Sequence, residues 1–522
     1  MIRFEKVSKT YAGQGHPALD NVTAEIEKGD TITSPQFTKG DHLRTFDYIV
    51  MNPPFSVKSW NNGLENDYGR FEYGRPPEKN GDYAFLLHAL TSLKSTGKAA
   101  IILPHGVLFR GNAEATIRTR LLKQGFIKGI IGLPANLFYG TGIPACVVIL
   151  DKENAQARTG VFMIDASKGF MKDGNKNRLR SQDLHKVVDT FNKQIEIDRY
   201  SRMVPMSEIA DAKNDYNLNI PRYIDSSEPE DLQDLSAHLH GGIPDRDLDA
   251  RQNYWDAFPQ LRSQIFAPNR PGYSDLAIDV SAVQQAIFDA PGFHKLRDEA
   301  TGIVADWFAA RRDALAGLTA DTKPNELIAT IGDDLLERFK PMPLLDEYDV
   351  YEQLMTYWHD TMHDDVYLVM ADGWLNAAKP RKTIEDKERK LSETPDLVVG
   401  SGRSATKYKM DLIPPSLIVA RYFAAKQATI DNLTAAAEEA TRAVEEYTEE
   451  HAVEDGLLAD AMDDGKISKA LVAARLKAIK TGGDPDEVKA LQYASKLYNA
   501  EASAKKAVKD AQADLDLATL RK

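Results

Sequence analysis

The chain has 522 residues with a formal net charge of −13, which excludes a protein that grips nucleic acid over its whole surface. Hydrophobic residues make up 43% and charged residues 27%, and the strand-length apolar runs are too short to span a bilayer. Cys146 is the one cysteine, which excludes an internal disulfide and a cysteine-rich zinc site and favours a cytoplasmic location.

Residues 1–20 differ in character from the rest of the chain. Two strand-like runs flank Tyr11, and this start resembles the opening of an ABC-transporter ATPase, in which an aromatic residue stacks on the nucleotide. The phosphate loop G-x-x-x-x-G-K-[ST] that such an ATPase needs is absent from the whole sequence. We therefore expect a foreign segment joined to the rest between residues 17 and 25.

Residues 21–225 have the pattern of an α/β domain. Helical patterns occupy residues 82–95 and 112–125, and the second ends on a C-capping Gly125. Short buried strands between helices predict a largely parallel sheet with helices on both faces. The last two strands have only a short polar connection, which suggests an antiparallel hairpin at one edge. The expected strands are residues 46–51, 99–103, 127–133, 145–150 and 161–165.

Residues 226–400 are expected to be mainly helical, and residues 401–522 to form a helical arm. Within the arm, Phe423, Ile430, Ala437 and Val444 fall seven residues apart, as in a heptad seam. A second seam begins at Ala494 and continues to Ala518. The sequence between them has breakers at both ends, which indicates an antiparallel coiled coil with a short inserted helix.

The sequence Asn52-Pro53-Pro54-Phe55 directly follows the strand-like run of residues 46–51. Proline cannot continue a central strand, so the strand must end there. An asparagine side-chain oxygen and the next main-chain carbonyl can accept both hydrogens of an amine such as the N6 group of adenine, and the prolines hold that carbonyl in place. Phe55 can stack on a base turned out of a duplex.

The alternative is that these residues form only a strand-ending turn. We favour the functional interpretation because open α/β sheets bind ligands at the carboxyl ends of their strands.

The tetrapeptide resembles motif IV of amino-methyltransferases acting on DNA. The surrounding sequence, from "TAEIEKGD" through "FDYIVMNPPFSVKSW" and "ILPHGVLFRG" to "LFYGTGIPACVVIL", resembles the methylation subunit of type I restriction-modification systems. The resemblance implies a Rossmann-like methyltransferase sheet and transfer of a methyl group from S-adenosyl-L-methionine to adenine N6 in DNA. It also implies four partners, namely DNA, a specificity subunit, a restriction subunit and a second methylation subunit, with no role for a membrane.

Carried over by position, Asn52 and Pro53 hold the target amine, Pro54 stiffens the loop, and Phe55 stacks on the adenine. The resemblance also gives roles in binding the methyl donor and in forming the far wall for the base. For the donor these residues are Asp30, Asp82 and Tyr83, and for the wall Phe138 or Tyr139. The structural alternatives are a turn aspartate at Asp30, a helix N-cap at Asp82 and a core aromatic at Tyr83.

One feature of the family is missing. A Gly-rich turn of the type Asp-Pro-x-Cys-Gly-Ser-Gly binds the methyl donor in these enzymes, and the 51 residues before Asn52 contain nothing similar. We therefore expect an incomplete sheet from which the cofactor half is largely missing, with an apolar strand left at the edge. The alternative function is a catalytically inactive remnant that only assembles with the specificity and restriction subunits.

Two weaker signals remain. His359 and His363 are spaced like a metal-binding pair on one helix face, but we interpret them as part of a polar face and predict no metal site. Basic stretches at residues 171–180, 380–390 and 401–411 can contact DNA phosphates or form solvated loops, and we favour the loops.

Overall fold

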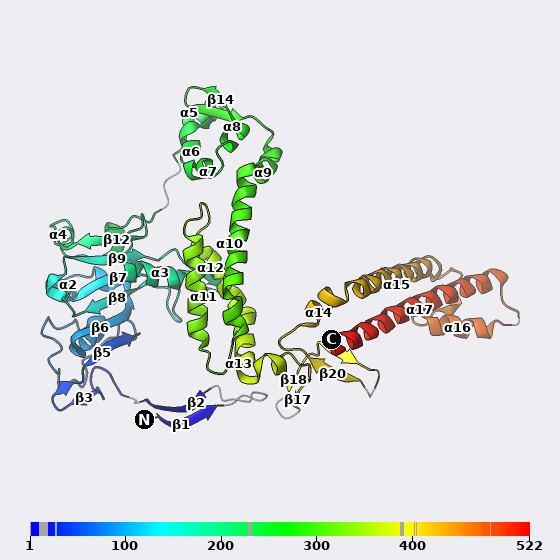
Figure 1. Cartoon of the computed structure of the whole chain (residues 1–522), viewed down its shortest axis with the longest axis horizontal. Coiled ribbons are helices and arrows are strands. Elements are labelled where there is room, and N and C mark those ends of the chain that lie inside the picture. Colours follow the sequence, from blue (N-terminus) through cyan, green and yellow to red (C-terminus); the bar gives the residue numbers. More distant parts are fainter. Residues whose placement is uncertain are drawn as a thin grey trace. The chain divides into compact units, whose positions relative to one another are not determined.

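The computed structural model describes residues 2–9, 19–26, 29–227, 232–386, 391–400, 402, 405–480 and 482–522 (Figure 1). The chain divides into two units. The first contains Met1–Gly317 and Lys323–His363, and the second contains Leu318–Thr322 and Asp364–Lys522. Among the described residues, no helix is long and apolar enough to cross a membrane.

The first unit is built on a six-stranded sheet with the order β12-β9-β7-β8-β6-β5. Its strands are β5 (Phe46–Met51), β6 (Leu93–Pro104), β7 (Ile127–Gly132), β8 (Ala145–Asp151), β9 (Gly160–Asp165) and β12 (Ser201–Pro205). The five predicted strands are therefore present, and β12 is an addition at one edge.

The predicted pairing of these strands is wrong in two respects. The sheet is mixed rather than largely parallel, because β5 with β6 and β7 with β9 are parallel while the other three pairs are antiparallel. In addition, β8 and β9 do not form a hairpin, because β7 lies between them. Strand β8 instead lies between β6 and β7 and forms backbone hydrogen bonds with both. Most of its residues are buried, as expected for a strand inside a sheet rather than at its edge.

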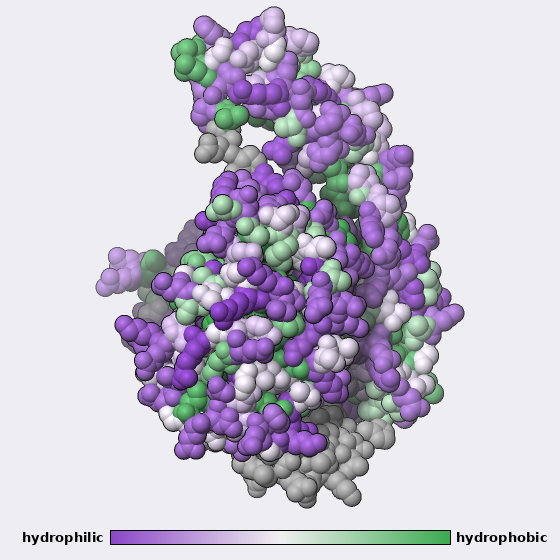
Figure 2. All heavy atoms as spheres, turned by 90° about the vertical axis from the view of Figure 1, so that its left-hand side faces the viewer, coloured by the Kyte–Doolittle hydropathy of each residue, from purple (hydrophilic) through white to green (hydrophobic). Residues whose placement is uncertain are grey.

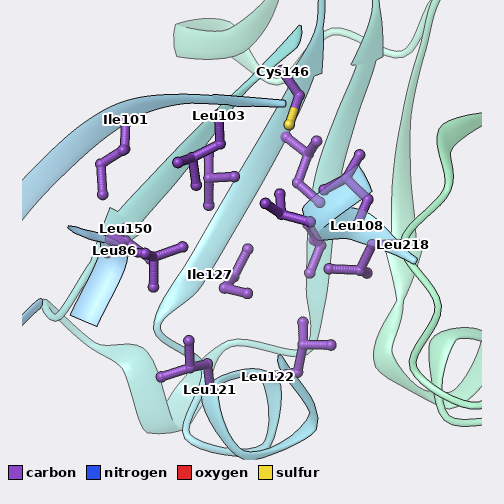
Figure 3. Packing of buried hydrophobic residues seen from close by; sticks show 14 of the residues in the cluster. Leu86, Ile101, Leu103, Leu108, Leu121, Leu122, Ile127, Cys146, Leu150 and Leu218 are labelled. Atoms are coloured by element: carbon purple, nitrogen blue, oxygen red, sulfur yellow. The ribbon is translucent and has the colours of Figure 1, made fainter. Parts of the chain in front are cut away.

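Helices cover both faces of the sheet, as predicted. On one face, α1 (Asp82–Thr91) and α2 (Asn112–Lys123) pack on the strands through a leucine- and isoleucine-rich core (Figure 3). On the other face, Phe191 of α3 (Ser181–Lys193) packs with residues of β7 and β9. Helix α2 ends as expected, since Gly125 follows it in the left-handed conformation with φ +69°. Helix α1 ends earlier than expected, because residues 93–95 already belong to β6.

Strand β5 lies at the edge of the sheet and has one uncovered face. Ile49 and Met51 pack against the core on the α1 side. The alternating residues Tyr48 and Val50 are 75% and 85% exposed. An apolar strand at an edge was predicted, and these two side chains are its exposed part.

Before the sheet, β1 (Ile2–Lys9) and β2 (Leu19–Ile26) pair antiparallel, which confirms two strands at the start of the chain. Tyr11, to which we gave a nucleotide-stacking resemblance, lies outside the described residues. A two-residue ladder, β3 (Thr38–Lys39) with β4 (His42–Leu43), precedes β5.

The rest of the first unit is mainly helical. Helix α12 (Glu347–Tyr357) docks on α3, because the backbone N–H of Gln182 donates to Glu352 at 2.8 Å and the His185 ring stacks on Tyr351 with centroids 4.7 Å apart. The remaining elements are hairpin β10 (Met171–Asp173) and β11 (Lys176–Arg178), α4 (Met206–Ile209), α5 (Leu235–His240), α6 (Asp245–Asp249), α7 (Gln252–Ala257), α8 (Leu261–Ile265), α9 (Val280–Phe288), α10 (Pro291–Ala316), α11 (Pro324–Phe339), α12 (Glu347–Tyr357) and the small sheet of β13 (Ile243–Pro244), β14 (Phe266–Arg270) and β15 (Tyr273–Leu276).

In the second unit, the long helices α15 (Ala424–His451) and α17 (Pro485–Arg521) run antiparallel, since Thr441 contacts Glu501 while Tyr447 contacts Ala490. Ile430, Ala437 and Val444, spaced seven apart in the sequence, are all buried. The helices are α13 (His363–Ala377), α14 (Pro415–Tyr422), α15 (Ala424–His451), α16 (Lys469–Ala478) and α17 (Pro485–Arg521). The strands are β16 (Arg381–Lys382), β17 (Glu385–Asp386), β18 (Leu391–Ser392), β19 (Leu397–Val399) and β20 (Thr406–Lys409).

Figure 2 shows one face of the chain, on which hydrophobic residues lie in small groups among hydrophilic ones. Such scattered exposure is ordinary for a protein in water and gives this face no large apolar patch.

Candidate active site

The four residues Asn52–Phe55 begin where β5 ends, next to the parallel strand β6. Asn52 is exposed, and its side chain has no hydrogen-bond partner within the described part of the chain. Pro53 is buried, while Pro54 is exposed. The asparagine amide is therefore available to a ligand, and the proline behind it is fixed by packing as well as by its ring.

The aromatic residue of the tetrapeptide already has an aromatic neighbour. Phe55 packs edge-to-face against Phe138, with ring centroids 5.5 Å apart and planes at 71°. The structure thus brings together two side chains that are 83 positions apart in the sequence. Tyr139, the other candidate for the far wall, is 96% exposed.

A base cannot lie between these two rings as they stand. Stacking on both faces requires two van der Waals contacts of roughly 3.5 Å, or about 7 Å between the rings. The Phe55–Phe138 separation of 5.5 Å is smaller. A base that stacks between the two rings therefore requires them to move apart.

The loop after Phe55 is held by Asp82 at the start of α1. One carboxylate oxygen of Asp82 accepts the backbone N–H of Ser56 at 2.7 Å, and the other accepts from Arg110 Nη1 at 2.7 Å. Asp82 is only 1% exposed. Ser56 has φ +53°, a conformation that a non-glycine residue adopts at a cost. The charge-assisted bond from Asp82 therefore stabilises the turn that orients the tetrapeptide.

A second carboxylate lies near the same arginine. Glu114 Oε1 is 3.5 Å from Arg110 Nη1, and Glu114 is 1% exposed. This is ion-pair distance without hydrogen-bond geometry, because neither Glu114 oxygen has a hydrogen-bond partner within the described residues. Burial raises the pKa of Glu114, against the opposing effect of Arg110.

Tyr83 points into the protein. Its hydroxyl donates to the carbonyl of Val107 at 2.8 Å, and the residue is 2% exposed. Arg118 Nη1 donates to the same carbonyl at 3.1 Å. Burial raises the pKa of Tyr83 well above its usual value. These contacts link α1 to the segment after β6.

Asp30 lies in a turn that packs beside the site, not at the end of a strand of the six-stranded sheet. One of its oxygens accepts the N–H groups of Ile32 and Thr33, both at 2.8 Å, and these bonds lower the pKa of Asp30. Ile32 is buried with Trp60, beside Met51 at the end of β5. Asp30 is therefore exposed and near the carboxyl end of β5.

Sequence reasoning missed three polar residues of this region. Arg110 is the partner of Asp82, and Arg70, only 1% exposed, donates to the carbonyl of Ile32 at 2.8 Å. His105 follows β6, and its buried Nε2 has no partner within the described residues. Burial lowers the pKa of His105. Each lies in or beside a loop without a repeating pattern, so no periodic signal marked it.

His359 and His363 lie on consecutive helical turns, within the π-helical turn Trp358–Met362 and at the start of α13. The described residues contain no cluster of three or more histidine, cysteine, aspartate or glutamate side chains that could hold a metal ion.

Comparison with known proteins identifies the part of the chain that carries this site. A match to the N-6 DNA Methylase family covers residues 18–232. The MpnII methylase subunit of a type I restriction enzyme from Mycoplasma pneumoniae is 31% identical over 255 residues, which are 47% of this chain and 46% of that protein. The MjaVII methylase subunit from Methanocaldococcus jannaschii is 34% identical over 233 residues, which are 42% of this chain and 39% of that protein.

Among solved structures, a type I restriction-modification methyltransferase subunit from Streptococcus thermophilus matches with 43% identity and a TM-score of 0.34, over 38% of this chain and 41% of that one. The chain spans less than half the length of these relatives. Residues 18–232 of this chain thus match the N-6 DNA Methylase family and are similar to the methylase subunits of type I restriction enzymes.

Proposed function

We propose that the chain is the methylation subunit of a type I restriction-modification system and transfers a methyl group to adenine N6 in DNA. One observation carries this proposal. Asn52, at the carboxyl end of β5, presents an amide without a partner in the described chain, directly beside the aromatic pair Phe55–Phe138. A polar acceptor next to an aromatic surface is what recognition of a flipped base requires.

In the proposed complex, the side-chain oxygen of Asn52 and the carbonyl of Pro53 accept the two hydrogens of the adenine amine. This draws the nitrogen towards tetrahedral geometry and makes its lone pair available. Phe55 stacks on the base, and Asp82 keeps the loop in place through Ser56. Positioning supplies most of the effect, so no strong general base is needed.

S-adenosyl-L-methionine is the methyl source implied by the family. Of the three residues assigned to it from the sequence, only Asp30 is exposed. Asp82 and Tyr83 are buried, and their polar atoms already bond to Ser56, Arg110 and Val107. In these positions Asp82 and Tyr83 do not fit direct contact with the methyl donor. Their role in binding the donor stays a prediction, and their bonds to Ser56, Arg110 and Val107 do not support it.

The partners proposed are DNA, a specificity subunit that selects the site, a restriction subunit and a second methylation subunit. The net charge of −13 supports this division of labour, because an acidic chain is poorly suited to bind DNA alone. We propose the helical arm of α15 and α17 as the coiled-coil element that docks on the specificity subunit by helix packing.

The first test is calorimetric titration of the chain with S-adenosylmethionine, alone and with its specificity subunit, followed by methyl transfer to unmethylated plasmid DNA. Asn52→Ala is expected to abolish transfer without loss of stability, because Asn52 is exposed. The matched control is Asn62→Ala, which changes an exposed asparagine ten residues away and leaves transfer unchanged. Equal transfer by native chain and N52A would refute the assignment.

A second candidate is a subunit that assembles but does not catalyse. The burial of Asp82 and Tyr83 and the exposure of Tyr48 and Val50 on the edge strand favour it. No donor binding in either state, by a chain whose circular dichroism shows it to be folded, supports this candidate over the enzyme.

A further inference from the structure

The loop between β7 and β8, residues 133–144, carries Phe138 and has little internal structure. Asn136 has φ +63° and Gly140 has φ +79°. Glycines add conformational freedom to the loop, and Asn136 adopts its left-handed conformation at a cost, so the loop needs support from its surroundings. The position of Phe138 against Phe55 therefore depends on contacts from outside the loop.

The hydrogen bonds among those contacts come from hairpin β10–β11, and apolar packing on the buried residues of β9 adds to them. Lys176 Nζ donates to the carbonyl of Phe138 at 2.8 Å and to that of Thr141 at 3.1 Å. Asn177 Nδ2 donates to the carbonyl of Ala135 at 2.7 Å, and the backbone N–H of Asn177 donates to Asn136 at 3.1 Å. Two adjacent residues of one short strand thus bind the loop on both sides of Phe138.

Of the two side chains that make these bonds, Asn177 is buried and Lys176 is half-buried. Asn177 is 8% exposed, and its Oδ1 is buried without a partner within the described residues. Turning the amide over would place this oxygen against the carbonyl of Ala135, so the observed orientation is the one that holds the loop. The Lys176 ammonium has carbonyls rather than carboxylates as its partners in the described chain.

We propose that Lys176 and Asn177 are positioning residues for the target-base pocket, and this inference rests on the proposed function. They set the position of the Phe138 ring relative to Phe55. Their hydrogen bonds to the loop limit how far Phe138 moves when the two rings separate to admit the base. Neither residue touches the reacting atoms.

The experiment compares Lys176→Met with Lys172→Met in the full chain, within the assembly that transfers methyl groups. Methionine keeps the apolar stem of lysine and removes its donors. Lys172 is the matched control, because it lies on the paired strand β10 with its ammonium over the Phe170 ring and makes no hydrogen bond to residues 133–144 in the described chain. Amide hydrogen exchange of residues 133–144 and steady-state methyl transfer to unmethylated plasmid DNA are measured for each.

We expect K176M to raise exchange in the loop about tenfold and to lower kcat about tenfold, with the KM for S-adenosylmethionine within twofold of native. K172M changes neither quantity, and Lys176→Arg, which retains donors, restores most of kcat. Should K176M not fold, Asn177→Asp gives the same comparison, because it is isosteric and removes the donor to Ala135.

Unchanged loop exchange in K176M overturns the anchoring, and raised exchange with native kcat overturns the positioning role. If the native chain transfers no methyl group in any assembly, the proposed function fails and the positioning role fails with it. That result is distinguishable from failure of the inference alone, in which the native chain is active and K176M is equally active.

Discussion

Replacing Asp82 by asparagine tests whether its carboxylate holds the loop after Phe55. The substitution keeps the shape and one acceptor for Ser56, but it removes the charge that faces Arg110 at 2.7 Å. Removing one partner of a buried ion pair costs about 3–5 kcal/mol. Arg110 is 31% exposed and retains Glu114 nearby, so solvent screening and that second carboxylate reduce the expected cost to about 2 kcal/mol.

This cost is expected locally, in the segment from Asn52 to the first turn of α1. Hydrogen exchange of peptides from this segment, followed through a urea series, measures the free energy of local opening. A loss of about 2 kcal/mol corresponds to roughly 30-fold faster exchange. Asp47→Asn is the matched control, because its ion pair with Lys94 also measures 2.7 Å but both side chains are about half exposed or more. Such a surface pair contributes about 0–1 kcal/mol. Equal exchange in D82N and D47N would refute the clamp.

Three further substitutions test the core around the site. Glu114→Gln removes a buried carboxylate whose pKa is raised by burial. We therefore expect urea denaturation to show a free energy of unfolding about 1 kcal/mol larger at pH 7, and no gain at a pH at which Glu114 is protonated. A smaller free energy of unfolding at pH 7 would contradict this. Burial lowers the pKa of His88 to about 4. As the pH falls below 6.5, His88 becomes protonated in the unfolded chain but stays neutral in the folded chain, so the free energy of unfolding falls by up to about 3 kcal/mol between pH 6.5 and 4. Glutamine does not titrate, so His88→Gln should flatten this pH dependence in denaturation curves. Gly125→Ala should lower the free energy of unfolding by about 2 kcal/mol, because φ is +69° and the added Cβ would clash with the carbonyl oxygen of Ala155. Gly111→Ala is the control, because the space around Gly111 is open, and its free energy of unfolding in thermal denaturation should stay within about 0.5 kcal/mol of native.

The sequence predicted the elements of the sheet better than their arrangement. The end of β5 was located correctly because Pro53 and Pro54 are local signals that need no partner to be read. The order of β7, β8 and β9 was not, because apolar runs of strand length indicate burial without indicating which strands become neighbours. Strand β6 starts six residues before its predicted start at residue 99. Residues 93–95 had been assigned to the preceding helix, because the exposed stretch from Lys94 to Thr96 has no apolar pattern that indicates a strand.

The site shows the same division between local and distant information. Asn52 and Phe55 were found from four consecutive residues, whereas the contacts that support them join residues far apart, such as Lys176 to Phe138 at a separation of 38 and Arg110 to Asp82 at 28. The orientation of Asp82 illustrates the consequence. As the first residue of α1, Asp82 could direct its carboxylate towards a ligand or towards the preceding loop. Its bond to Arg110 helps to hold it towards the loop, and the local sequence does not reveal that Arg110 lies beside Asp82. Because these distant contacts hold the loops on both sides of the proposed base pocket, substitutions in them should alter the site even though they leave the residues that line it unchanged.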